Sequence, residues 1–161
     1  MRKSCQILLV VPLILGTSCA EGARSSLAEG HADAASQLSL QTAAFAPGGF
    51  IPARFTCKGD DVSPALAWSG SPANTRAFAL IVEDPDAPAG TWTHWLVYDL
   101  PSSARALPEG VPKTGEISGG GRQGTNDFGK IGYGGPCPPP GKPHRYFFRL
   151  YALNARLQLN A

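Results

Sequence analysis

Two acidic side chains and two histidines stand at the ends of three apolar segments in this 161-residue chain. Asp84 and Asp86 follow the first segment in the sequence Asp-Pro-Asp-Ala-Pro, His94 opens the second, and His144 opens the third together with Tyr146. Imidazole and carboxylate groups can transfer protons, bind phosphoryl groups or ligate zinc, depending on their surroundings. If the three segments are neighbouring strands, their ends bring these side chains together in one site.

Each of these residues also has a purely structural interpretation. The prolines on either side of Asp86 fix a rigid turn, in which its carboxylate is expected to cap backbone amides. For Asp84, a capping role and a role in the site are both open. A single histidine between two tryptophans, such as His94, more often satisfies hydrogen bonds in a core than binds a ligand. His144 and Tyr146 lie two apart and so share a strand face, which makes a binding site the better interpretation.

The Gly/Pro-rich segment 115–141 lies directly upstream of His144 and is long for a simple connection. Its Gly134-Gly135 step can turn backbone N–H groups toward an anion. Two other matches in this segment are interpreted as accidents of a glycine-rich composition. Residues 119–124 spell GxGxxG without the strand and helix that a dinucleotide site needs, and Asp127-Phe128-Gly129 spells a kinase motif whose companions are absent.

Short apolar runs, separated by many of the 19 glycines and 15 prolines, predict strands joined by turns rather than long helices. The clearest predicted strands are residues 77–83, 93–100 and 145–153, and weaker candidates are 44–45 and 66–68. Residues 102–107 are the one expected helical turn. Several strands with almost no helix predict an all-β fold, with a β-sandwich or Greek-key arrangement.

The N-terminal residues have the pattern of a secretory signal. Positively charged Met1-Arg2-Lys3 precedes the apolar run 7–15, which is too short to span a bilayer and is followed by small residues. This predicts a signal peptide over residues 1–20, a tether or frayed helix over 21–43, and a domain over 44–161. Gly-Thr-Ser-Cys, which ends at Cys19, leaves open a lipoprotein signal, cut before Cys19 and lipidated there.

Export decides the expected state of the cysteines and of the charge. In an oxidising compartment Cys57 and Cys137 are expected to form a disulfide, whereas two free thiols are the alternative for a chain that stays inside. Loss of Arg2 and Lys3 leaves 12 of the 14 basic residues against 12 acidic ones. A neutral domain has no electrostatic footprint for nucleic acid or an anionic membrane. Membrane contact is therefore expected only through a lipid at Cys19, and any anion must be bound by close donors.

Five motifs in this order resemble the phosphatidylethanolamine-binding protein family, and most of all its bacterial, Raf kinase inhibitor-like branch. They are TCKGDDVSPALAW from Thr56, DPDAP from Asp84, THW from Thr93, YGGPCPPPG from Tyr133 and HRY from His144. The resemblance covers about residues 45–153. It implies a Greek-key β-sandwich with a small pocket at one edge that accepts phosphate-like anions or phospholipid head groups, without a cofactor. The pocket positions that it implies are Asp84, Pro88, Trp92 at the rim, His94, Gly135, His144 and Tyr146. Family members continue with a further segment after residues like 151–153, so the resemblance implies a truncated C-terminus.

We therefore expect an exported binding protein that holds a phosphoryl group with His94 and His144. The resemblance also implies that it could regulate a partner protein, as some relatives do, but the partner is unidentified. A neighbouring Asp84 favours the charged form of a histidine, whereas burial beside Trp92 and Trp95 opposes it. Two alternatives are open. The His/Asp cluster can bind zinc for hydrolysis, although the chain has no GxSxG or HExxH motif. It can also be a buried hydrogen-bond network in a structural envelope domain.

Overall fold

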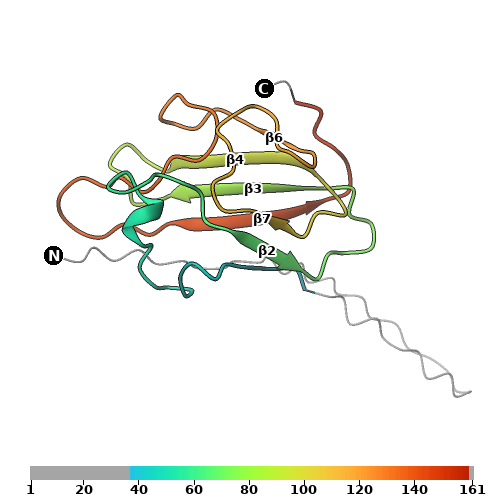
Figure 1. Ribbon diagram of the computed structural model, residues 1–161, viewed down its shortest axis with the longest axis horizontal. Coiled ribbons are helices and arrows are strands. Elements are labelled where there is room, and N and C mark those ends of the chain that lie inside the picture. The colour runs from blue at the N-terminus through green and yellow to red at the C-terminus, as the bar shows by residue number, and fades with distance from the viewer. Residues whose placement is uncertain (1–36, 160–161) are drawn as a thin grey trace, which may run out of the picture.

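The computed structural model describes residues 37–159, which form a mostly β structure (Figure 1). Four strands form one antiparallel sheet in the order β6-β4-β3-β7, and three form a second antiparallel sheet in the order β1-β2-β5. The elements are β1 (Ser39–Gln41), a 3-10 helix η1 (Ala53–Phe55), β2 (Leu66–Ser69), β3 (Ala77–Asp84), β4 (Trp92–Pro101), β5 (Ala106–Leu107), β6 (Arg122–Gln123) and β7 (Phe147–Leu153). The predicted signal peptide, the lipidation candidate Cys19 and most of the predicted tether lie outside the described residues.

In the larger sheet, the last residues of β3 lie beside the first residues of β4 and β7, at one end of the strands. β3 lies between β4 and β7 and runs antiparallel to both, so the end of β3 is adjacent to the start of each neighbour. Asp84 is opposite Trp92 of β4, and Glu83 is opposite Phe147 of β7. The predicted meeting of the strand ends is therefore confirmed.

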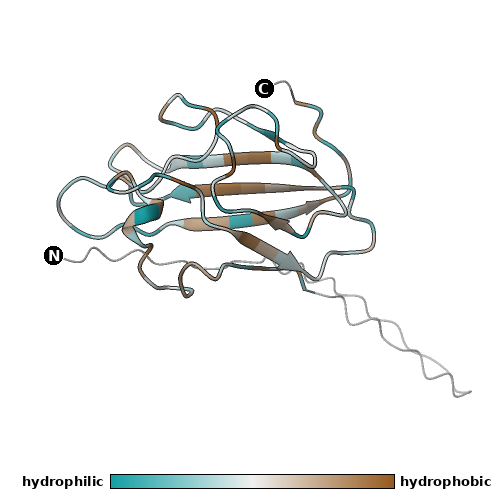
Figure 2. Ribbon diagram, viewed as in Figure 1, coloured by the Kyte–Doolittle hydropathy of each residue, from teal (hydrophilic) through white to brown (hydrophobic). Residues whose placement is uncertain are grey.

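The hydrophobic core draws on both sheets and holds them together. Figure 2 shows the hydrophobic residues concentrated along β2, β3 and β4. The buried cluster includes Leu40, Leu66 and Trp68 from the smaller sheet and Phe78, Leu80 and Trp95 from the larger one. The mostly β fold with two antiparallel sheets is confirmed, whereas the Greek-key connection and the C-terminal truncation stay predictions.

The prediction was wrong for two short segments of the smaller sheet and its surroundings. Residues 44–45 form a bend rather than a strand, and the ring of Phe45 is buried against Phe55 and Phe148 at centroid distances of 6.2 and 6.0 Å. The first strand is β1, inside the segment interpreted as a tether, because Leu40 is buried and pairs with Trp68 of β2. A strand of three residues shows no periodicity of its own.

Two further differences concern turns. Residues 102–107 do not form a helical turn: after a turn at 102–103 the chain enters β5, which pairs with β2 and buries Leu107. β7 begins at Phe147, two residues later than predicted. The N–H of Arg145 donates to the carboxylate of Asp86 at 2.8 Å rather than to a neighbouring strand, which keeps residues 144–146 out of the ladder.

Candidate functional site

A cavity of about 250 Å³ opens where β3 ends and β4 begins. Six of the seven predicted pocket residues line it: Asp84, Pro88, Trp92, His94, His144 and Tyr146. The remaining lining residues are Ala87, Ala89, Phe128, Cys137, Pro138 and Pro139. Two other cavities, one lined by Leu40 and Phe45 and one by Asp99 and Arg122, contain no histidine. The predicted cluster therefore surrounds one cavity, which we call the histidine pocket.

His144 is held by a carboxylate. Its Nδ1 lies 2.7 Å from Oδ2 of Asp84, and both side chains are buried. The other oxygen, Oδ1 of Asp84, accepts the N–H of Asp86 at 2.8 Å. Asp84 thus has both roles that the sequence left open, because it caps the turn after β3 and orients a histidine of the pocket.

His94 is held by the backbone instead. Its Nδ1 lies 2.6 Å from the carbonyl oxygen of Gly134, and its ring packs edge-to-face against Phe128 and Tyr146. Burial lowers the pKa of His94 below its ordinary value, and the Gly134 carbonyl and Asp84 only partly oppose this shift. Of the two opposing effects on the pKa of His94, burial is therefore larger than the attraction of the carboxylate, because Asp84 hydrogen-bonds to the other histidine.

These contacts fix which ring nitrogen is left for a ligand. A carbonyl oxygen and a carboxylate accept hydrogen bonds, so Nδ1 of both His94 and His144 carries the hydrogen. Nε2 is then the second nitrogen of each ring. A neutral ring offers a lone pair at Nε2, and a protonated ring offers an N–H there. The protonation of Nε2 therefore decides whether each histidine can donate to an anion.

The turn beside the pocket is fixed by an ion pair. The Asp86 carboxylate accepts from the backbone N–H, Nε and Nη2 of Arg145, at 2.8, 2.9 and 2.7 Å for the shortest contact of each. The guanidinium of Arg145 lowers the pKa of Asp86 to about 2. The capping role expected for Asp86 is confirmed, and the cap joins the turn after β3 to the residue that follows His144.

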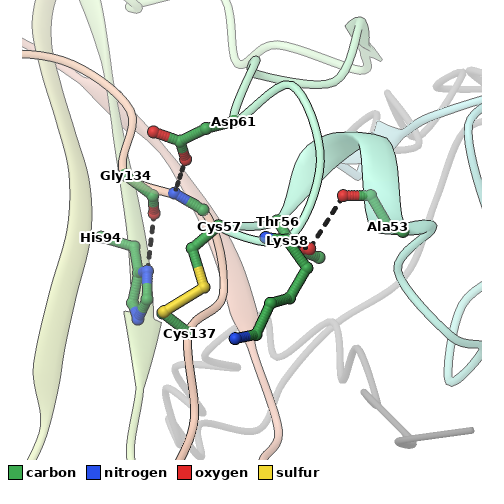
Figure 3. Close-up of a disulfide and its surroundings, with 9 residues drawn as sticks. Ala53, Thr56, Cys57, Lys58, Asp61, His94, Gly134 and Cys137 are labelled. Carbon is green, nitrogen blue, oxygen red and sulfur yellow. Dashed lines mark hydrogen bonds between the residues drawn. A yellow bond between two sulfur atoms is a disulfide. The ribbon is translucent and has the colours of Figure 1, made fainter.

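Gly135 has a different role from the one predicted. It does not line the histidine pocket, and its N–H donates to Oδ1 of Asp61 at 2.6 Å (Figure 3). The N–H of Gly134 donates to the carbonyl of His94 at 2.8 Å. Both amides are therefore occupied within the protein. A Cβ at Gly135 would lie 2.6 Å from the carbonyl oxygen of Phe55, so this glycine is needed for close packing of two loops.

A disulfide closes one wall of the pocket, as predicted. Cys57 and Cys137 are bonded with a Cα–Cα distance of 5.4 Å (Figure 3). The N–H of Cys57 also donates to the carbonyl of Pro136 at 3.2 Å, and the hydroxyl of Tyr133 donates to the carbonyl of Phe55 at 2.7 Å. Because Cys137 lines the cavity, these links anchor the Gly/Pro-rich loop that forms its wall.

The sequence interpretation missed a loop that reaches the pocket. Phe128, dismissed there as part of an accidental kinase motif, lines the cavity and packs against Trp92 and His94. Asn126 and Asp127, which precede it, bond to the surrounding backbone. A large aromatic residue in a loop otherwise rich in glycine and polar residues was the available signal.

Two further observations bear on the alternatives. Within residues 37–159, no three His, Cys, Asp or Glu side chains are gathered so that they could hold a metal ion. No helix in that part of the chain has the length and hydropathy that crossing a bilayer requires.

Comparison with known proteins gives consistent matches. Residues 41–161 match the family model described as phosphatidylethanolamine-binding protein. The chain is 50% identical over 122 residues to a UPF0098 protein of Methanothermobacter thermautotrophicus, which covers 76% of this chain and 80% of that protein. It is 43% identical over 129 residues to a Mycobacterium tuberculosis protein named as a candidate lipoprotein, LppC, covering 80% of this chain and 61% of LppC.

Two crystal structures have similar folds. A phosphatidylethanolamine-binding protein homologue from Chlamydia trachomatis superposes with a TM-score of 0.69 at 40% identity, covering 78% of this chain and 80% of that one. Escherichia coli YbcL, described as a member of the mammalian PEBP family, gives a TM-score of 0.67 at 36% identity, covering 73% of this chain and 77% of YbcL.

Proposed function

This chain belongs to the phosphatidylethanolamine-binding protein family, and from that premise we propose that it is an exported binding protein whose histidine pocket holds a phosphate-like anion. The observation that carries the proposal is the hydrogen bonding of His94 and His144. Both rings use Nδ1 within the protein and both line one cavity, so each has Nε2 for a ligand. A phosphoryl group, free or in a phospholipid head group, has several acceptor oxygens that two such rings can share.

The same geometry gives the binding a direction with pH. His94 has a lowered pKa and is mostly neutral at neutral pH, so it has no Nε2–H to donate. An anion binds better to the protonated ring, and by linkage it raises the pKa of that ring. Affinity is therefore expected to rise as the pH falls, without any change in the fold. The Gly134 and Gly135 amides contribute no donors, because both are occupied.

Export is supported by the Cys57–Cys137 disulfide, since disulfides persist mainly outside the reducing cytoplasm. The lipoprotein name of the mycobacterial relative points in the same direction, and we keep Cys19 as the candidate lipid anchor. Regulation of a partner protein is part of the proposal only as a family trait. The described residues supply no feature that identifies the partner.

Calorimetric titration with inorganic phosphate and phosphoethanolamine at pH 5.5 and pH 8 tests the proposal. Loss of one charge-assisted hydrogen bond is expected to weaken binding by about tenfold or more in His94→Ala and in His144→Ala. Tyr151→Ser, an uncharged change at a 39% exposed residue of β7 that does not line the pocket, is the control and should bind as the wild type does. Equal affinity in all four proteins would remove the histidines from the site.

A second measurement separates binding from the two alternatives. A purely structural network predicts that His94→Ala lowers the melting temperature and that no protein in the series binds phosphate. A zinc hydrolase predicts bound zinc in the purified protein and turnover of p-nitrophenyl phosphate that a chelator abolishes. Our proposal predicts reversible phosphate binding with no turnover.

A further inference from the structure

The peptide link between Gly134 and Gly135 connects His94 with a carboxylate on another loop. Its carbonyl oxygen, on Gly134, lies 2.6 Å from Nδ1 of His94, and its N–H, on Gly135, donates to Oδ1 of Asp61 at 2.6 Å. Figure 3 shows the two hydrogen bonds as dashed lines. Because a trans peptide directs its N–H and its C=O in opposite directions, Asp61 and His94 are the two ends of one hydrogen-bonded chain.

A chain of this kind carries the influence of the carboxylate to the imidazole ring. A carboxylate that accepts the N–H of a peptide polarises that peptide, and its carbonyl oxygen becomes a stronger acceptor. The stronger acceptor holds the hydrogen of His94 on Nδ1, which leaves Nε2 for a ligand. It also favours the protonated ring, because the charged ring is the better donor.

The local backbone brings the carboxylate to this N–H. Asp61 has a φ of 54°, in the left-handed region that residues other than Gly, Asn and Asp seldom adopt. A conformation of this kind persists where the surrounding structure requires it. A Cβ at Gly135 would lie 2.7 Å from Oδ1 of Asp61, so a glycine is needed for the carboxylate to come this close. Each side of the contact therefore has the residue type that the contact requires.

The second oxygen of Asp61 has a cationic partner. Oδ2 accepts from Nζ of Lys113 at 2.6 Å, and the two side chains are 39% and 41% exposed. Water and the ammonium group therefore screen part of the charge of Asp61. The effect of Asp61 on His94 should accordingly be modest, and Lys113 should oppose it rather than add to it.

The other charged groups around His94 act on it in a different way. Asp84 at the end of β3 and Asp127 favour its charged form, as Asp61 does, while burial lowers its pKa and is the largest effect. The carboxylate of Asp84 is bonded to His144, and that of Asp127 to the backbone N–H next to His94. Asp61 is the one of these three carboxylates that is bonded to the peptide holding Nδ1.

We propose that Asp61 is a positioning residue of the histidine pocket, which acts through the Gly134–Gly135 peptide to keep Nε2 of His94 for the ligand and to favour protonation of that ring. Asp61 does not line the cavity, so it acts without touching the anion. This role rests on the proposed function, because the protonated ring is the form that donates to an anion. The effect on the ring itself can be measured without a ligand.

Nitrogen NMR of the ligand-free protein measures the pKa of His94 in the wild type, Asp61→Asn and Lys113→Gln. Asparagine tolerates a positive φ, and its side-chain carbonyl can still accept the Gly135 N–H, so Asp61→Asn removes the charge and keeps the contact. A unit charge at roughly 8 Å in a partly solvated site changes a pKa by about 0.5 unit, and Asp61→Asn should lower the pKa of His94 by this amount. Lys113→Gln breaks the same ion pair but keeps the carboxylate, so the pKa of His94 should stay unchanged or rise slightly.

Two further measurements accompany these pKa values. In the wild type alone, the amide resonance of Gly135 should titrate with the pKa of His94, because both groups belong to the same hydrogen-bonded chain. Calorimetric titration with inorganic phosphate at pH 7 should show about threefold weaker binding in Asp61→Asn, as follows from a pKa lowered by about 0.5 unit. The difference from the wild type should be smaller at pH 5, and Lys113→Gln should bind phosphate at least as tightly as the wild type.

A merely structural role of Asp61 would lower the melting temperature in both variants without lowering the pKa of His94. An equal pKa of His94 in the wild type and Asp61→Asn, or an equal lowering in Asp61→Asn and Lys113→Gln, would overturn this inference alone. So would a Gly135 amide that does not follow the titration of His94, or an unchanged affinity for phosphate in Asp61→Asn at pH 7. Failure of the wild type to bind phosphate would overturn the proposed function, whereas the effect of Asp61 on the ring would still be measurable.

Discussion

Replacing both disulfide cysteines, Cys57→Ser with Cys137→Ser, should lower the free energy of unfolding by about 3–4 kcal/mol. The two cysteines are 80 residues apart, and the entropy of closing a loop of that length corresponds to about 4.5 kcal/mol at 25 °C. Part of the wall stays attached in the variant, because the Gly135–Asp61 hydrogen bond does not depend on the sulfur atoms. A small domain has only about 5–15 kcal/mol in total, so the change is easily measured.

Urea unfolding, followed by tryptophan fluorescence, measures this change on the wild type and the double variant. Adding a reductant should bring the wild type to the midpoint of the variant and leave the variant unchanged, because the cross-link acts mainly on the unfolded chain. The Ser/Ser variant also avoids a new free thiol at either position. A loss below about 1 kcal/mol, or a reductant effect in the variant, would refute the assignment of this stability to the disulfide.

Three other changes test separate parts of the structure. Because burial lowers the pKa of His94, the unfolded chain binds more protons than the folded chain below about pH 6.5. The free energy of unfolding should therefore fall as the pH drops through that value. Urea unfolding at pH 7.5 and 5.5 should show a smaller fall in His94→Gln than in the wild type. Gly135→Ala should cost about 1–3 kcal/mol, because its Cβ would lie 2.6 Å from the Phe55 carbonyl oxygen. Gly124→Ala, whose Cβ would meet only side-chain atoms of Leu96 and Tyr98 at 3.3 Å or more, should cost less when both are measured by urea unfolding, and an equal loss in both would contradict the crowding argument. The pKa of the Asp86 carboxylate is about 2 against an ordinary 3.8, so its ionised form should stabilise the fold above pH 4, and this stabilisation should disappear as the pH falls from 3.8 to 2. Thermal unfolding of Asp86→Asn should show no such loss of stability across that range.

The part of the site that the sequence predicted follows from strand ends and turn chemistry. Prolines after Asp84 mark the end of β3, and aromatic residues around His94 mark the start of β4, so local signals were enough to bring these side chains to one edge. The pairing of Asp84 with His144 rather than His94 was not predictable. The pairing depends on which of the two histidines lies closer to the carboxylate of Asp84 in the turn after β3. The register of β7 against β3 determines this, because it sets the position of His144.

The parts that the sequence missed depend on contacts between distant residues. Gly135 was expected to offer its amide to a ligand, but Asp61, 74 residues earlier, accepts that hydrogen bond. Phe128 was dismissed because its neighbours spell an unrelated motif, and only the folded loop brings it to His94. Leu40 lies in a segment with no periodicity, and its strand exists because β2 is beside it. In each case the residue that is contacted in the folded chain, and not the local sequence, determines what the residue does.

Nitrogen NMR of the imidazole rings can show whether His94 and His144 bind an anion through Nε2. The chain has only three histidines, and His31, outside the described residues, is the internal reference. Without ligand, His94 should carry its hydrogen on Nδ1 and titrate below 6.5. Saturating phosphate should shift the Nε2 resonances of His94 and His144 and raise the pKa of His94, whereas equal ionic strength of chloride should do neither. Nε2 resonances and a His94 pKa that stay unchanged when phosphate is added would show that the two histidines do not bind phosphate.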